Sequence, residues 1–196
     1  MLKYLPLAGL LLPLQIFAQS LTPEVLATLP KVGEPAISPD GKWVVYAVDQ
    51  ISLADNKGDK DLFIISALGG KVKKLVGGKG GQFAPKWIND EELAYLNTES
   101  GAPQVWKVNI KSEKTQALTK VEAGVGGFEL TADGGLIYLS DVKTTKDVHD
   151  IYPDLPKVEA RIIDDLFYRH WDSWDDYSNT HVFIGQKDAS GLVTGG

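Results

Sequence analysis

Apolar and β-branched residues occur along the chain in short runs, and residues that favour turns separate the runs. The tetrapeptide Ser38-Pro39-Asp40-Gly41 lies between two such runs. Pro presets φ, Asp accepts backbone hydrogen bonds within a turn and Gly adopts positive φ, so this tetrapeptide predicts a hairpin turn. The flanking runs are rich in Val, Tyr and Trp, which favours strands over helices.

The runs form a repeating unit with four expected strands. The first unit covers residues 32–76, and the pattern returns over 83–119 and again over 127–196. Tyr46, Tyr95 and Tyr138 occupy the same place in the three units. Four strands in a unit of roughly 40–50 residues are typical of a propeller blade. A β-sandwich also uses short strands, but it would not predict the recurring aromatic position.

The fold class is therefore expected to be all-β, as a partial β-propeller. Trp43, Trp87 and Trp106 lie within expected strands, and we expect them in the core. The glycine-rich residues 77–81 lack the spacing of a phosphate-binding loop and are expected to connect two blades.

The third unit departs from the other two. An insertion over residues 141–180 separates its second and third strands, and the chain ends where its outermost strand should begin. Fewer than three complete blades cannot close a ring, because closed propellers have 4 to 8. We therefore expect a truncated fragment with an open, aggregation-prone edge.

The first 18 residues predict a secretory signal peptide. Lys3 is followed by an apolar stretch over residues 5–18, which Pro6 and Pro13 interrupt and which ends at the small residue Ala18. A membrane anchor needs about 20 apolar residues, so no membrane span is expected. The remaining residues 19–196 are expected to be exported, to the periplasm or the cell exterior.

Charge and cysteine content exclude several functions. The net charge is −6 and no Lys/Arg cluster stands out, so nucleic-acid binding is not expected. The absence of cysteine excludes disulfides, thiolate zinc sites and a cysteine nucleophile. No cofactor is expected.

The insertion gathers aromatic, acidic and basic residues. Carboxylates pair with a peptide's ammonium group, and Trp faces attract cations. The candidate substrate-binding residues are Arg169, His170, Trp171, Asp172 and Trp174. Alternatively, the same residues fix the insertion against its blade. The spacing of His170, Asp172, Asp175 and Asp176 matches no known metal motif, so no metal site is expected.

The insertion also carries a family resemblance. Residues 150–157 read DIYPDLPK, residues 160–166 read ARIIDDL and residues 168–174 read YRHWDSW. With these segments and the turn over residues 38–43, the chain resembles the N-terminal propeller of exported prolyl oligopeptidase-family serine peptidases, in the branch of bacterial dipeptidyl-peptidases and acylaminoacyl-peptidases. The turn by itself is weak evidence for this family, because the same turn sequence recurs in many TolB-like propellers.

This resemblance implies a propeller that caps a C-terminal α/β-hydrolase domain and admits short peptides. In that family the hydrolase domain carries a Ser-Asp-His triad, and acidic groups of dipeptidyl peptidases hold the free amine. The nucleophile elbow G-x-S-x-G does not occur in this chain, so no residue of it is expected to be catalytic. The expected partners are a peptide substrate and the missing hydrolase domain. The alternative is a non-enzymatic, TolB-like periplasmic propeller that binds proteins or glycans.

Overall fold

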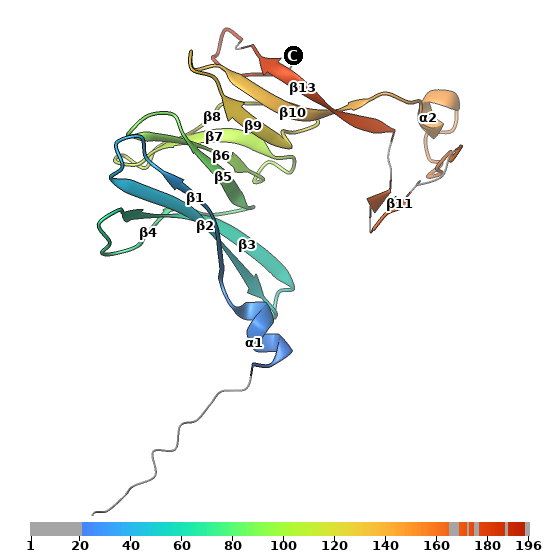
Figure 1. The fold of residues 1–196 in the computed structure, drawn as a ribbon. Helices are drawn as coiled ribbons and strands as arrows, with labels where there is room; N and C mark the ends of the chain where they lie inside the picture. Colours follow the sequence, from blue (N-terminus) through green and yellow to red (C-terminus); the bar gives the residue numbers. More distant parts are fainter. Residues whose placement is uncertain (1–20, 165–168, 172, 175–176, 187, 195–196) are drawn as a thin grey trace, which may run out of the picture.

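In a computed structural model of the protein, the described residues form three larger antiparallel sheets that follow one another along the chain, and a small two-stranded sheet (Figure 1). The structure describes residues 21–164, 169–171, 173–174, 177–186 and 188–194. A short helix, α1 (Pro23–Thr28), precedes the first sheet. Its first turn begins with the N-cap Thr22, whose side chain accepts a hydrogen bond from Val25 N. The expected signal peptide lies outside the described residues.

Each of the first two sheets is a four-stranded meander, as expected for a propeller blade. Blade 1 contains, in spatial order, β1 (Lys31–Ile37), β2 (Trp43–Ser52), β3 (Lys57–Ser66) and β4 (Lys73–Val76). Blade 2 contains, in the same order, β5 (Gln82–Trp87), β6 (Glu92–Asn97), β7 (Gln104–Asn109) and β8 (Thr115–Ala117).

Blade 3 has three strands among the described residues, in the order β13-β10-β9. They are β9 (Gly127–Leu130), β10 (Leu136–Lys143) and β13 (Ser178–Gly185). Strands β10 and β13 pair over their whole lengths, from Leu136 opposite Gly185 to Lys143 opposite Ser178. The strands therefore reach three residues into each end of the expected insertion, because residues 141–143 pair with residues 178–180.

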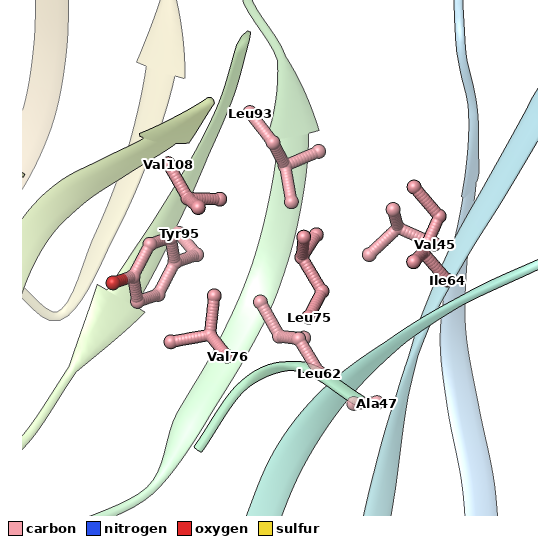
Figure 2. Close-up of a cluster of buried hydrophobic side chains, with 9 residues drawn as sticks. All are labelled: Val45, Ala47, Leu62, Ile64, Leu75, Val76, Leu93, Tyr95 and Val108. Carbon is pink, nitrogen blue, oxygen red and sulfur yellow. The ribbon is translucent and has the colours of Figure 1, made fainter. Parts of the chain in front are cut away.

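Hydrophobic side chains join the blades into one stack. The core between blades 1 and 2 is shown in Figure 2 and contains Val45, Ala47, Leu62, Ile64, Leu75, Val76, Leu93, Tyr95 and Val108. The core between blades 2 and 3 contains Ala94, Leu96, Val105, Val121, Val125, Phe128, Leu136, Tyr138 and Val193. Alternate residues of β6 enter different cores, since Leu93 and Tyr95 face blade 1 while Ala94 and Leu96 face blade 3.

The recurring tyrosine marks one face of every blade. Tyr95 and Tyr138 are buried against the preceding blade, and the equivalent Tyr46 is half-buried on the outer face of blade 1. Each tyrosine lies opposite an aromatic residue of the next strand: Phe63, Trp106 and Phe183, respectively. The ring centroids of Tyr138 and Phe183 are 5.3 Å apart in a stacked arrangement. These repeated pairs, with the sheet order, confirm the all-β, propeller-like fold.

The core prediction fails for one of the three tryptophans. Trp87 and Trp106 pack against the core between blades 1 and 2, and Trp87 Nε1 donates a hydrogen bond to Ala36 O of blade 1 at 3.1 Å. Trp43, in contrast, is 36% exposed. It is the first residue of β2 and lies at the end of the sheet, where the neighbouring blade no longer covers it.

The chain after β13 returns to blade 2. Val193 forms a parallel bridge with Thr119: Val193 N donates to Leu118 O at 2.9 Å, and Lys120 N donates to Val193 O at 2.8 Å. The Val193 side chain is buried in the core between blades 2 and 3. We call this pairing of Leu118–Lys120 with Val193 the stitch.

Candidate functional site

A long connection between β10 and β13 leaves the body of the sheets. It covers residues 144–177, and we call it the arm. Figure 1 shows its helix α2 (Val148–Ile151) and its strand β11 (Arg169–His170) well away from the three blades. A second short strand, β12 (Ser173–Trp174), pairs with β11. In its described part, the arm thus projects from the end of blade 3.

Acidic residues organise the base of the arm. Asp147 is the N-cap of α2, and its side chain accepts hydrogen bonds from the backbone N–H groups of His149 at 2.8 Å and Asp150 at 3.0 Å. Lys143 Nζ lies 2.6 Å from Asp147 Oδ2 and 2.5 Å from Asp150 Oδ2. The Lys143 ammonium and these backbone donors lower the pKa of Asp147 to about 2. The start of the arm is therefore fixed to the end of β10.

Tyr177 closes the arm where the chain returns to β13. Its backbone oxygen accepts hydrogen bonds from the N–H groups of Thr144 at 2.8 Å and Thr145 at 3.1 Å. Its hydroxyl accepts a hydrogen bond from Ile162 N at 2.8 Å and contacts Ile162 O at 3.4 Å. One residue thus links the start, the middle and the end of the arm.

The β11–β12 hairpin carries a stacked aromatic and cationic group. The guanidinium carbons of Arg161 and Arg169 lie 4.9 Å and 5.4 Å from the centroid of the Trp174 ring. Between the two strands, Trp171 has a φ of 56° and is 90% exposed. A positive φ is strained for a bulky residue, and such strain is concentrated at functional sites. The hairpin thus presents Trp171 to solvent and places Trp174 beside two guanidinium groups.

A cavity of about 560 Å³ lies between α2 and the returning part of the arm. Its lining includes charged groups of both signs, namely Lys143, Asp147, Glu159 and Arg161, together with Tyr177. A volume in this range suits a small molecule or part of a short peptide. The Glu159 carboxylate and the Arg161 guanidinium provide partners for an ammonium and a carboxylate group, respectively.

Three of the five candidate residues come together in the described part of the hairpin: Arg169, Trp171 and Trp174. His170 pairs with Ser173 through the backbone, while its side chain and the whole of Asp172 lie outside the described residues. Sequence reasoning missed Glu159 and Arg161 as site residues, whereas Tyr177 belongs to the aromatic and charged cluster that the insertion shows in the sequence. Arg161 lies within the segment ARIIDDL, but its contact with Trp174 depends on how the arm folds back.

No group of three or more His, Asp or Glu side chains that could hold a metal ion occurs among the described residues. Asp172, Asp175 and Asp176 lie outside them, so the expectation for that cluster stays a prediction. Within the same described part, no helix has the length and apolar character needed to cross a membrane.

Comparison with known proteins identifies relatives that are named as peptidases. The chain is 35% identical to dipeptidyl-peptidase 5 of Porphyromonas endodontalis over 187 residues, which cover 93% of this chain and 27% of that protein. It is 37% identical to dipeptidyl-peptidase 5 of Porphyromonas gingivalis over 180 residues, which cover 91% of this chain and 26% of that protein. The chain thus spans about a quarter of the length of these curated relatives. No protein-family model matches it.

Solved structures support the fold. An acylaminoacyl peptidase of Pyrococcus horikoshii superposes with a TM-score of 0.61 at 15% identity, over 85% of this chain and 24% of that one. The AtxE2 isopeptidase superposes with a TM-score of 0.53 at 21% identity, over 61% of this chain and 23% of that one. The predicted resemblance to the propeller of dipeptidyl-peptidases and acylaminoacyl-peptidases is confirmed, and the chain is related to peptidases.

Proposed function

We propose that this chain is the substrate-gating part of an exported serine exopeptidase that acts on short peptides. The observation that carries the proposal is the identity of 35–37% with dipeptidyl-peptidases over more than nine-tenths of the chain. In this proposal the chain binds and orients the peptide, and a partner α/β-hydrolase domain supplies the nucleophile, the base and the oxyanion hole.

The position of the arm supports this role. The arm joins the second and third strands of blade 3, and in blade 1 the equivalent end of the sheet lies beside α1. The arm and α1 therefore mark the same ends of their blades, and we propose that this side faces the hydrolase domain. A projection of this length would then extend over the path by which a peptide approaches the catalytic residues.

The charges on the arm suit a short peptide with free ends. The carboxylate of Glu159, which is exposed, would pair with the peptide's ammonium group, as would the candidate Asp172, which lies outside the described residues. Arg161 and Arg169 would pair with its carbonyl or carboxylate oxygens, and the exposed Trp171 would cover an apolar side chain. Longer or folded chains would collide with the arm and the blades.

A peptidase assay tests the proposal directly. The full polypeptide that contains this chain is tested with chromogenic dipeptides that have free or blocked N-termini, and the 196-residue chain alone serves as control. We expect the full polypeptide, but not the 196-residue chain, to cleave the dipeptides, with a preference for the substrate that has a free N-terminal amine. Absence of cleavage with both substrates would reject the peptidase role and favour a binding propeller.

Variants of the arm test the gating role separately. We expect Glu159→Gln to raise KM for the free-amine substrate by about tenfold, because one charge-assisted contact is lost, and to leave kcat nearly unchanged. Glu122→Gln, an exposed position far along the chain from the arm, is the matched control. Equal KM values for both variants would mean that the Glu159 carboxylate does not hold the amine.

A further inference from the structure

Two crevices open between neighbouring blades, at the end that carries the turns between the first and second strands. The crevice between blades 1 and 2 has a volume of about 610 Å³, and its lining includes Trp43 and Ile64. The crevice between blades 2 and 3 has a volume of about 520 Å³, and its lining includes Trp87, Glu92 and Lys107. Both lie on the opposite end of the blades from the arm.

The repeat makes these two crevices directly comparable. Since Tyr46 is equivalent to Tyr95, Trp43 is equivalent to Glu92, and by the same register Ile64 is equivalent to Lys107. One blade therefore places an apolar pair at these positions, and the next blade places an ion pair there. Because the fold forms with either pair, the ion pair is not a requirement of blade packing.

The ion pair is partly buried within apolar walls. Lys107 Nζ lies 2.8 Å from Glu92 Oε1, and each side chain is 29% exposed. Asn89 Nδ2 donates a hydrogen bond to Glu92 Oε2 at 3.1 Å. Lys107 lowers the pKa of Glu92, so the carboxylate is ionised at neutral pH. Partial removal of two charges from water is costly and stabilises a fold little, which suggests another use for this pair.

We propose that the crevice between blades 2 and 3 binds a free α-amino acid with a large apolar side chain. The ligand ammonium would pair with Glu92, its carboxylate would pair with Lys107, and its side chain would lie against Leu118 and Leu130, which pack on the core between these two blades. The Glu92 carboxylate and the Lys107 ammonium lie next to each other. A free amino acid carries its ammonium and carboxylate on the same α-carbon and so matches this spacing, whereas a longer peptide holds its two terminal charges far apart. The volume lies within the range of small-molecule sites.

The other crevice would not bind such a ligand in the same way. Its charged lining residues in the described chain are Lys71, Lys73 and Lys111, and the carboxylates that pair with Lys73 and Lys111, those of Glu113 and Glu91, are not part of its lining. The proposed site therefore depends on the Glu92–Lys107 pair and not on the shape that both crevices share. It is independent of the peptidase role, because it lies away from the arm.

Calorimetric titration of the 196-residue chain tests the proposal with four probes: L-phenylalanine, N-acetyl-L-phenylalanine, L-phenylalanine amide and glycine. We expect L-phenylalanine to bind at least about tenfold more tightly than each of the others, because each lacks one charge or the side chain. Absence of binding, or equal affinity for the blocked probes, would overturn the proposal without the use of any variant.

Two variants then assign the contacts. Glu92→Gln should abolish the preference for L-phenylalanine over its N-acetyl form, and Lys107→Gln should abolish the preference over its amide. Glu129→Gln is the matched control, since it removes the ion pair with Lys86 between the same two blades outside the crevice. Circular dichroism checks that each variant is folded. Unchanged preferences in both crevice variants, or their loss in the control, would contradict the assignment.

Discussion

Gly185 and Val193 illustrate how closely single side chains determine the packing of blade 3. A Cβ atom added at Gly185 would lie 3.1 Å from both Cγ atoms of Val193 and 3.1 Å from Leu136 O. These distances are shorter than ordinary contacts between carbon atoms of about 3.5–4.0 Å. Only glycine therefore allows Val193 to reach the core between blades 2 and 3 without displacement.

We expect Gly185→Ala to lower the free energy of unfolding by about 1–3 kcal/mol, since an overpacked site must shift backbone or displace a buried side chain. Gly127→Ala is the matched control, because its Cβ would contact only the Leu139 side chain, at 3.5 Å or more. Denaturant unfolding of both variants measures the difference. Equal losses of stability would show that the contact with Val193 is not limiting.

Single positions also show what the sequence could predict. The recurring tyrosine was predictable, because alternation along a strand fixes which face a residue occupies. The exposure of Trp43 was not predictable, since alternation along a strand does not indicate where the neighbouring blade ends. The ion pair of Glu92 and Lys107 was also missed, because it depends on the register between β6 and β7.

Among the elements, the arm has described contacts at its base and at its return to β13. Its base depends on Asp147 and Lys143, and its return depends on Tyr177. The insertion could be recognised from the sequence because it interrupts a repeat. Its direction could not, because the hairpin register and the contact of Arg161 with Trp174 arise only when distant parts of the arm meet.

Tyr177→Phe should loosen the middle of the arm, because the hydrogen bond from Ile162 N to the hydroxyl is lost. We expect backbone amides near residue 162 to exchange with solvent several-fold faster, while the blades are unchanged. Tyr152→Phe is the control, since Tyr152 is a half-exposed tyrosine of the same arm. Hydrogen exchange followed by mass spectrometry gives the rates, and equal rates in both variants would contradict this role of the hydroxyl.

The base of the arm should also respond to acid. Because the pKa of Asp147 is lowered from 3.8 to about 2, its contribution to stability is present above about pH 4 and is lost as the pH falls towards 2. We expect the protection of the α2 amides, relative to their intrinsic exchange rate at each pH, to fall over this range. Asp147→Asn should already show reduced protection at pH 7 and little further loss of protection in acid. An unchanged pH profile in the variant would refute the assignment to Asp147.

For the whole molecule, the blades were predictable from the repeat, but the contacts that join them were not. Lys86, for example, forms an ion pair with Glu129 of the next blade, 43 residues further along the sequence, and no local sequence pattern predicts this ion pair. In the described part of the chain, β13 is an edge strand. Val182 and Ile184 on this strand are 68% and 71% exposed.

An open edge with exposed apolar residues promotes association between chains. We expect Ile184→Lys to reduce self-association of the 196-residue chain without loss of stability, because the side chain makes few contacts. Leu68→Lys is the control, since Leu68 is 99% exposed in a turn of blade 1. Light scattering over a range of concentrations measures the effect. An equal reduction in both variants would indicate a general effect of charge.

Because Val193 pairs with Leu118–Lys120 in the stitch, backbone hydrogen bonds join blades 2 and 3 in addition to the polypeptide connection between them. Residues 122–123 are exposed within that connection, while Val193 hydrogen-bonds to Leu118 and Lys120 on its other side. A protease that nicked the chain between Glu122 and Ala123 would therefore leave two fragments that stay together. The pair of fragments should also reassemble when expressed separately.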